Sequence, residues 1–204
     1  VALIGGDTTH GPLAATVTVG GWVPPGAALL RSGARPGDEL WISGTPGDAG
    51  AGLAILQSRL AAGSAVREEL LRRFLLPEPR VNLGLALRGI ASACIDVSDG
   101  VAGDLAKLCR ASGVGARLDC PRLPRSRQLI EAAGEAGSMR FALSGGDDYE
   151  LLFTAPATAG HRIEALAPVT PVSRIGEITA TPGLQLQGAG PERDFAHGFD
   201  HFTD

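Results

Sequence analysis

The feature that most constrains the fold is a repeated alternation of short apolar runs and helical patterns, divided by glycine and proline. Apolar and β-branched runs predict strands at residues 2–4, 15–19, 39–43, 91–97, 114–118, 149–154, 169–179 and 184–187. Helical spacing of apolar residues predicts helices after Asp48 and at residues 66–76, 81–90, 101–112, 126–135 and 158–166. Such alternation predicts an α/β or α+β fold built on one mixed sheet.

We expect a domain boundary near Pro25. The run Pro24-Pro25-Gly26 favours an extended connector, and the first two strand patterns lie before it. The expected parts are therefore a short N-terminal part, residues 1–25, and a main α/β domain, residues 26–204. With 204 residues, 44% of them hydrophobic, the chain is long enough to bury a proper core.

Composition excludes several classes of protein. A net charge of −4 and a pI near 5.6 argue against a nucleic-acid-binding surface. No apolar run approaches the ~18 residues of a membrane span, so no membrane partner is expected. Cys94, Cys109 and Cys120 match no zinc or disulfide spacing, which favours free thiols in a reducing cytoplasm.

Three acidic segments flanked by glycine carry the candidate chemistry: residues 5–9, 96–100 and 144–150. Each adjoins an expected strand, and carboxylates at strand ends are suitable ligands for Mg²⁺. Lys107 is the only lysine, and no Walker-type phosphate loop is present. Metal ions and arginine would therefore have to balance the charge of any bound phosphate.

Structural explanations compete with these functional ones. Asp99 before a helix could simply be its cap, and the Gly-Gly-Asp run at residues 5–7 is a common turn. Residues 147–150 could be a solvated acidic turn, and Arg31 a solvated helical residue. Asp96 is harder to explain, because an unpaired carboxylate at the end of so apolar a strand would cost several kcal/mol.

Four longer stretches carry a family resemblance. In order, they read LIGGDTTHGPL, VPPGAALLRSGARPGDELWISGTPGDAGAGL, CIDVSDGVAGDL and FALSGGDDYELLFTAP. Together they resemble the thiamine-monophosphate kinases over essentially the whole chain. The wider superfamily, with aminoimidazole-ribonucleotide synthetase and selenophosphate synthetase, shares related acidic motifs.

The resemblance implies a function. Members of this family transfer the γ-phosphoryl group of ATP to thiamine monophosphate, giving thiamine diphosphate, with the help of Mg²⁺. It also implies a cytoplasmic homodimer, formed by an N-terminal domain of which residues 1–25 would keep two strands. The acceptor is an ionised phosphate, so positioning and charge neutralisation matter more than a general base.

Site residues follow from the resemblance motif by motif. Asp7, Asp96 and Asp99 would ligate Mg²⁺. Gly6, Asp7, Arg31 and Ser98 would contact ATP. Asp147 would lie against thiamine monophosphate, and Phe199 would pack on its ring, with Phe202 an open alternative and plain core packing of the tail another.

We expect this polypeptide to be inactive alone, because the family begins well upstream of residue 5. Two alternatives stay open: a related ATP-dependent synthetase with another acceptor, and a ligand-binding chain without catalysis. Unpaired strands at residues 2–4 and 15–19 would also favour a dimer or higher oligomer.

Overall fold

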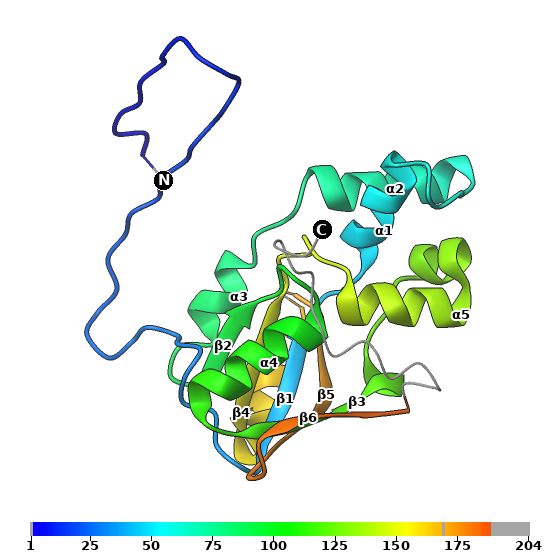
Figure 1. Ribbon diagram of the computed structural model, residues 1–204. Coiled ribbons are helices and arrows are strands. Elements are labelled where there is room, and N and C mark those ends of the chain that lie inside the picture. Colours follow the sequence, from blue (N-terminus) through cyan, green and yellow to red (C-terminus); the bar gives the residue numbers. More distant parts are fainter. Residues whose placement is uncertain (1, 169, 189–204) are drawn as a thin grey trace.

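Strands and helices alternate along the chain, as the hydrophobic pattern predicts (Figure 1). The structure, a computed structural model, describes residues 2–168 and 170–188. Its strands are β1 (Asp38–Ser43), β2 (Ala93–Asp96), β3 (Gly115–Asp119), β4 (Leu151–Pro156), β5 (Val172–Thr179) and β6 (Gly183–Gln187). Its helices are α1 (Asp48–Leu56), α2 (Ser64–Leu75), α3 (Val81–Ala86), α4 (Val101–Ser112), α5 (Arg127–Ser144) and α6 (Gly160–Glu164).

The strands form one six-stranded sheet in the order β2-β4-β1-β5-β3-β6. Neighbours pair antiparallel except β3 and β6, which are parallel. The expected mixed sheet of an α/β fold is therefore confirmed. In the β2–β4 pair, Asp96 lies opposite Leu151, so β2 ends where β4 begins.

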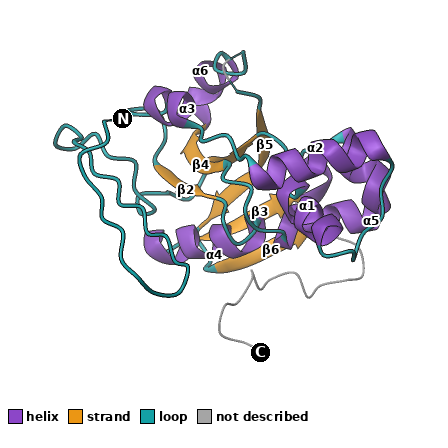
Figure 2. Cartoon of the chain, turned by 90° about the horizontal axis from the view of Figure 1, so that it is seen from above, coloured by secondary structure: helices purple, strands orange, loops and turns teal. Residues whose placement is uncertain are grey.

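Helices cover both faces of the sheet (Figure 2). Helix α4 lies on one face and α3 and α6 on the other, while α1, α2 and α5 gather at one end. Alternation along β1 explains this layering: Leu40 and Ile42 point into the α4 side, and Trp41 points into the α3/α6 side. All three are at most 4% exposed, and each such burial stabilises the fold by about 1.5–3 kcal/mol.

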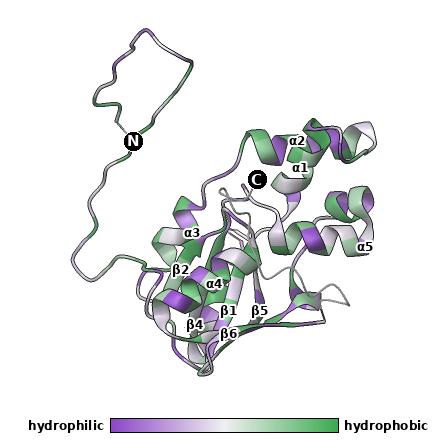
Figure 3. Cartoon of the chain, viewed as in Figure 1, coloured by the Kyte–Doolittle hydropathy of each residue, from purple (hydrophilic) through white to green (hydrophobic). Residues whose placement is uncertain are grey.

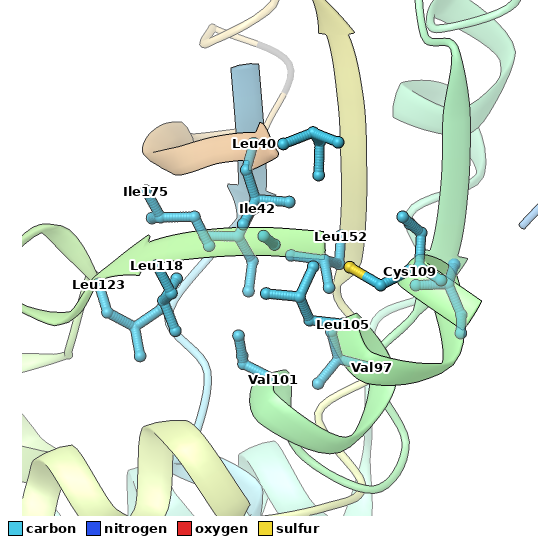
Figure 4. Packing of buried hydrophobic residues seen from close by; sticks show 14 of the residues in the cluster. Leu40, Ile42, Val97, Val101, Leu105, Cys109, Leu118, Leu123, Leu152 and Ile175 are labelled. Carbon is cyan, nitrogen blue, oxygen red and sulfur yellow. The ribbon is translucent and has the colours of Figure 1, made fainter. Parts of the chain in front are cut away.

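The main core lies between the sheet and α4 (Figure 4). Leu105 of α4 packs there beside Leu152 of β4 and Leu118 of β3, and all three are fully buried. Hydrophobic and hydrophilic residues alternate along α4 (Figure 3), and its hydrophobic residues pack against the sheet. A separate cluster with Ile55 and Leu70 joins α1, α2 and α5.

Helix α5 is longer than predicted. We expected it to end at residue 135, but it continues to Ser144 with a break at Gly134, where φ is 68°. Glycine permits that conformation, and a glycine normally ends a helix there. The helix resumes because Ala142 and Leu143 bury completely beyond the break, and this tertiary packing outweighs the local stop signal.

The two strands expected at residues 2–4 and 15–19 are wrong. Residues 2–26, called the arm below, have no regular secondary structure, lie fully in solvent and extend away from the body (Figure 1). A strand persists only when its backbone groups pair with a neighbour, and no described strand lies beside the arm. The division of the chain near Pro25 stays a prediction. Within the described residues, no helix has the length and apolar character to cross a membrane.

Candidate functional site

Two glycine-bearing loops meet where β2 ends and β4 begins. The first, residues 97–100, joins β2 to α4, and the second, residues 145–150, joins α5 to β4. Three backbone N–H groups link them: Asp147 donates to Ser98 (3.0 Å), Tyr149 to Val97 (2.9 Å) and Val97 to Glu150 (2.8 Å). The loops thereby extend the β2–β4 pairing beyond the sheet, which brings two of the three predicted acidic segments together.

Glycine is required for this close approach. Gly100 has φ of 100°, and a Cβ there would lie 2.7 Å from the Cα of Ser144. A Cβ on Gly146 would lie 2.5 Å from the carbonyl oxygen of Ser98. Neither position has room for a side chain, so the glycines of both motifs set the distance between the loops.

A residue that the sequence analysis missed organises the first loop. The Asp104 carboxylate is 1% exposed and accepts the backbone N–H groups of Ser98 and Asp99, both at 2.9 Å. Lys107 donates to it at 2.8 Å. The alternative that Asp99 caps the helix is wrong, because the N-cap position before α4 is Gly100 and no side chain caps the helix. An acid in the first turn of a helix was the available signal for Asp104.

The acids of the second loop point in different directions. Asp148 is 4% exposed and accepts the N–H groups of Gly47 (2.6 Å) and Ala49 (3.1 Å) at the start of α1. Burial raises the pKa of Asp148 to about 8, against the opposing effect of these two donors. Asp48, the first residue of α1, is buried and accepts hydrogen bonds from the hydroxyl groups of Thr45 and Ser126.

Glu150 forms a buried ion-pair network. Its carboxylate is fully buried and binds Arg80 through two bonds (2.6 and 2.8 Å) and Arg73 through one (2.9 Å). Burial acts to raise the pKa of Glu150, but hydrogen bonds from Arg80 and Ser43 outweigh it and hold the pKa below its usual value. The acids of residues 147–150 therefore have separate partners, and a solvated acidic turn does not describe the loop.

Asp147 stays partly exposed near Asp96, Asp99 and Tyr149, a group of residues called the loop mouth below. It and Tyr149 have φ of 66° and 52°, sparsely populated values for residues other than glycine. The Tyr149 hydroxyl donates to the Asp147 carboxylate at 3.2 Å. Burial and the charge of Asp147 raise the Tyr149 pKa, and Asp96 and Asp99 add to the effect. Three carboxylates thus lie near one half-exposed ring.

The oxygen-bearing side chains in this cluster suit the coordination chemistry of a magnesium ion. Asp96 is exposed at the end of β2, Asp99 is half-buried, and the Ser98 hydroxyl lies 3.4 Å from Asp99. Within residues 2–168 and 170–188, no three His, Cys, Asp or Glu side chains form a complete metal site. Mg²⁺ commonly uses one or two carboxylates and completes its shell with waters and phosphate oxygens, and this oxygen-only set suits that mode.

Other predicted residues lie elsewhere. Gly6 and Asp7 are in the arm, where the Asp7 carboxylate accepts only the N–H of its neighbour Thr8 (2.8 Å) among the described residues. Arg31 lies at the far end of α4, since its carbonyl oxygen accepts from Ser112 at 3.1 Å. Twelve residues of helix, about 18 Å, separate that end from Asp99. Phe199 and Phe202 lie outside the described residues.

A hollow on the other face of the sheet is a weaker candidate. It has a volume of about 650 Å³ and lies between β1, β5 and α6, with Trp41 in its wall. Its charges are largely satisfied by one another, as in the pair of Glu39 with Arg174 (3.1 Å). A ligand there would have to compete with these internal pairs, whereas Asp96 and Asp147 at the loop mouth are partnered far less.

This α/β domain with its two paired acidic loops matches a known protein family. Residues 35–189 match the family described as AIR synthase related protein, C-terminal domain. This match spans most of the chain, and the chain belongs to that family.

Two curated thiamine-monophosphate kinases are similar to this chain over nearly its whole length. The chain is 45% identical to the thiamine-monophosphate kinase of Salmonella typhimurium and 46% identical to that of Escherichia coli K12, each over 98% of this chain. It spans 63% of the length of each of these curated relatives.

Solved structures of related proteins have a similar fold. A crystal structure of thiamine-monophosphate kinase from Stenotrophomonas maltophilia has a TM-score of 0.77 and 43% identity, covering 81% of this chain and 55% of that one. AaThiL complexed with AMPPCP and TMP has a TM-score of 0.72 and 33% identity, covering 85% of this chain and 54% of that one. Escherichia coli HypE, 22% identical, shares the fold (TM-score 0.64, covering 82% and 52%).

Proposed function

We propose that this chain is part of a thiamine-monophosphate kinase, which transfers the γ-phosphoryl group of ATP to thiamine monophosphate. The observation that carries the proposal is 45–46% identity to proteins of that name over 98% of this chain. The AaThiL complex holds AMPPCP and TMP together, which supports a site for a nucleotide and a phosphate-bearing acceptor. The paired loops offer this chain's residues for such a site.

The first loop would bind the nucleotide. Ser98 would donate its hydroxyl hydrogen bond to a phosphate oxygen at the start of α4, where helix geometry favours anions. Asp96 and Asp99 would hold Mg²⁺, which would neutralise phosphate charge during transfer. Asp7, Gly6 and Arg31 remain predicted nucleotide or metal contacts; they would join the site only if the arm and its base lay against the loops.

The second loop would hold the acceptor. Asp147 faces the same mouth as Asp99 and is held there by its backbone bond to Ser98 (3.0 Å). Its carboxylate would orient thiamine monophosphate, while Glu150 and its arginines keep the loop rigid from behind. Phe199 stays a predicted contact of the substrate ring. Positioning of this kind supplies much of the rate of phosphoryl transfer.

We further propose a cytoplasmic homodimer in which the arm is covered. The arm exposes large apolar side chains, with Leu3, Ile4, Leu13 and Trp22 each at least 95% exposed. A surface of this kind usually marks a protein contact. Reduced, buried cysteines are consistent with the cytoplasm.

A ligand-binding titration tests the function without relying on turnover. Calorimetry with thiamine monophosphate, in the presence of Mg²⁺ and AMPPCP, should show binding by the wild type. We expect Asp147→Ala to lose at least tenfold in affinity for thiamine monophosphate, and Ser98→Ala to weaken nucleotide binding instead. Release of ADP in a coupled assay would report turnover in the same samples.

The result also separates the alternatives. Nucleotide binding without any binding of thiamine monophosphate would overturn the proposal and favour a synthetase with another acceptor. Binding of both ligands without ADP release by the full-length protein would favour a ligand-binding role, whereas this polypeptide alone is expected to show no turnover in either case.

A further inference from the structure

Lys107 lies between two carboxylates at the start of α4. It is the only lysine of the chain, whose other basic side chains of this kind are all arginines. Its ammonium group contacts the Asp99 carboxylate and donates to Asp104 at 2.8 Å. One of these partners is a predicted magnesium ligand, and the other holds the backbone of the same loop.

The two carboxylates are not equivalent partners. The Asp104 side chain is 1% exposed, and all its bonds are internal: two backbone N–H groups on one oxygen and Lys107 on the other. The Asp99 side chain is 21% exposed, and its second oxygen has only the Ser98 hydroxyl at 3.4 Å. Removing Lys107 from Asp104 would leave a buried charge unpaired, whereas Asp99 can exchange Lys107 for another cation.

We propose that Lys107 is a tethered counter-ion that competes with the divalent cation for Asp99. The inference rests on the proposed function only for the role of Asp99 as a metal ligand. Without a cation, Lys107 bridges both acids and holds Asp99 in place. When a divalent cation binds Asp99, the ammonium stays with Asp104 and leaves Asp99. Lys107 is therefore a positioning residue that sets the cation affinity of the loop.

Side-chain chemistry favours this role. A lysine ammonium is a compact charge on a flexible stem with three donors, so it can release one partner and keep another. A guanidinium forms a rigid, often bidentate fork with a carboxylate. Asp104 anchors the Ser98 and Asp99 backbone through its other oxygen, so the exchange need not disturb the loop.

Binding of Mn²⁺ alone tests the proposal. The cation is titrated into the full chain and followed by electron paramagnetic resonance, with no nucleotide or thiamine compound present. Removing a partly exposed competitor should tighten Mn²⁺ binding by Lys107→Gln about fivefold. Lys107→Arg should bind at or below the wild-type affinity, and Asp99→Asn should lose the site. Arg72→Gln, which removes an exposed pair with Glu69 on α2, is the matched control and should change nothing.

A purely structural role for Lys107 predicts a different result. Lys107→Gln would then melt earlier and bind Mn²⁺ equally or more weakly, and that outcome overturns the proposal. If Lys107→Gln does not fold, Asp104→Asn/Lys107→Gln removes both charges of the buried pair and must show the same tightening. Failure of Asp99→Asn to change Mn²⁺ binding, or no Mn²⁺ binding by any variant, would overturn it as well.

The Mn²⁺ titration can fail independently of the thiamine monophosphate titration that tests the proposed function. Tighter Mn²⁺ binding by Lys107→Gln without any binding of thiamine monophosphate would sustain the counter-ion role and reject the kinase. Binding of thiamine monophosphate with unchanged Mn²⁺ affinity would do the reverse.

Discussion

Two regions of the chain carry the sequence Gly-Gly-Asp, and they differ in the hydrogen bonds and the packing that surround it. In the arm, Asp7 is fully exposed and accepts one bond from the next residue. In the body, Asp147 follows Gly145-Gly146 and is tied through its backbone to Ser98 on another loop. Buried partners support that second loop, and none among the described residues supports the first. A carboxylate becomes part of a site only when the surrounding fold determines where it points.

The strongest test of this contrast removes the support behind Asp147. Glu150→Gln would leave the largely buried Arg73 and Arg80 side chains (12% and 14% exposed) without their shared carboxylate, so the free energy of unfolding should fall by about 3–5 kcal/mol. Urea denaturation followed by circular dichroism measures the loss. The control is Glu69→Gln, whose exposed pair with Arg72 should be worth less than ~1 kcal/mol. Equal losses in the two variants would contradict a supporting role for Glu150.

A smaller effect is expected where the loops touch. Gly100→Ala puts a Cβ against the Ser144 backbone at positive φ, and should cost about 2–4 kcal/mol. Gly113→Ala also lies at positive φ (68°) but meets no atom within 4 Å, so it should cost about 1 kcal/mol. Thermal melts of both variants measure the difference. A Gly100→Ala protein as stable as Gly113→Ala would show that the loops are not closely packed.

The smallest effect should come from the arm. Asp7→Asn removes a carboxylate that has no partner beyond Thr8 among the described residues, so unfolding free energy should change by less than ~0.5 kcal/mol. Chemical denaturation of the wild type and variant at one protein concentration measures it. A loss above 1 kcal/mol would mean that the Asp7 carboxylate itself has a partner in the body or in another copy, and would remove the contrast between the two regions.

Local pattern predicted most of the body correctly. The run of apolar residues before Asp96 and the helical spacing after Gly100 predicted β2 and α4, and the structure confirms both. The strands at residues 2–4 and 15–19 were wrong because β-branched composition shows only that a segment suits a sheet. Pairing needs a partner strand, which no local pattern supplies. The predicted end of helix α5 came too early, because the sequence does not show that Leu143, beyond the glycine break, is buried.

The acidic residues show the same limit. The spacing of Asp96, Ser98 and Asp99 was enough to identify a candidate loop, and the role of Asp147 as a ligand contact stays a prediction from the family resemblance. Asp104 went unnoticed because its role depends on reaching back to backbone groups of the preceding loop. Asp148 and Glu150 could not be told from Asp147 by sequence, since their partners Gly47 and Arg80 lie about 100 and 70 residues away.

The sequence by itself determined the alternation of strands and helices, the glycines at the turns and the supply of carboxylates, because these depend on residues close in the chain. The tertiary structure alone decided which carboxylates are buried with arginine or backbone N–H groups and which face the mouth. That choice depends on contacts between distant segments, where the cost of burying a charge selects fully partnered acids for the interior and leaves Asp96 exposed and Asp99 and Asp147 partly exposed.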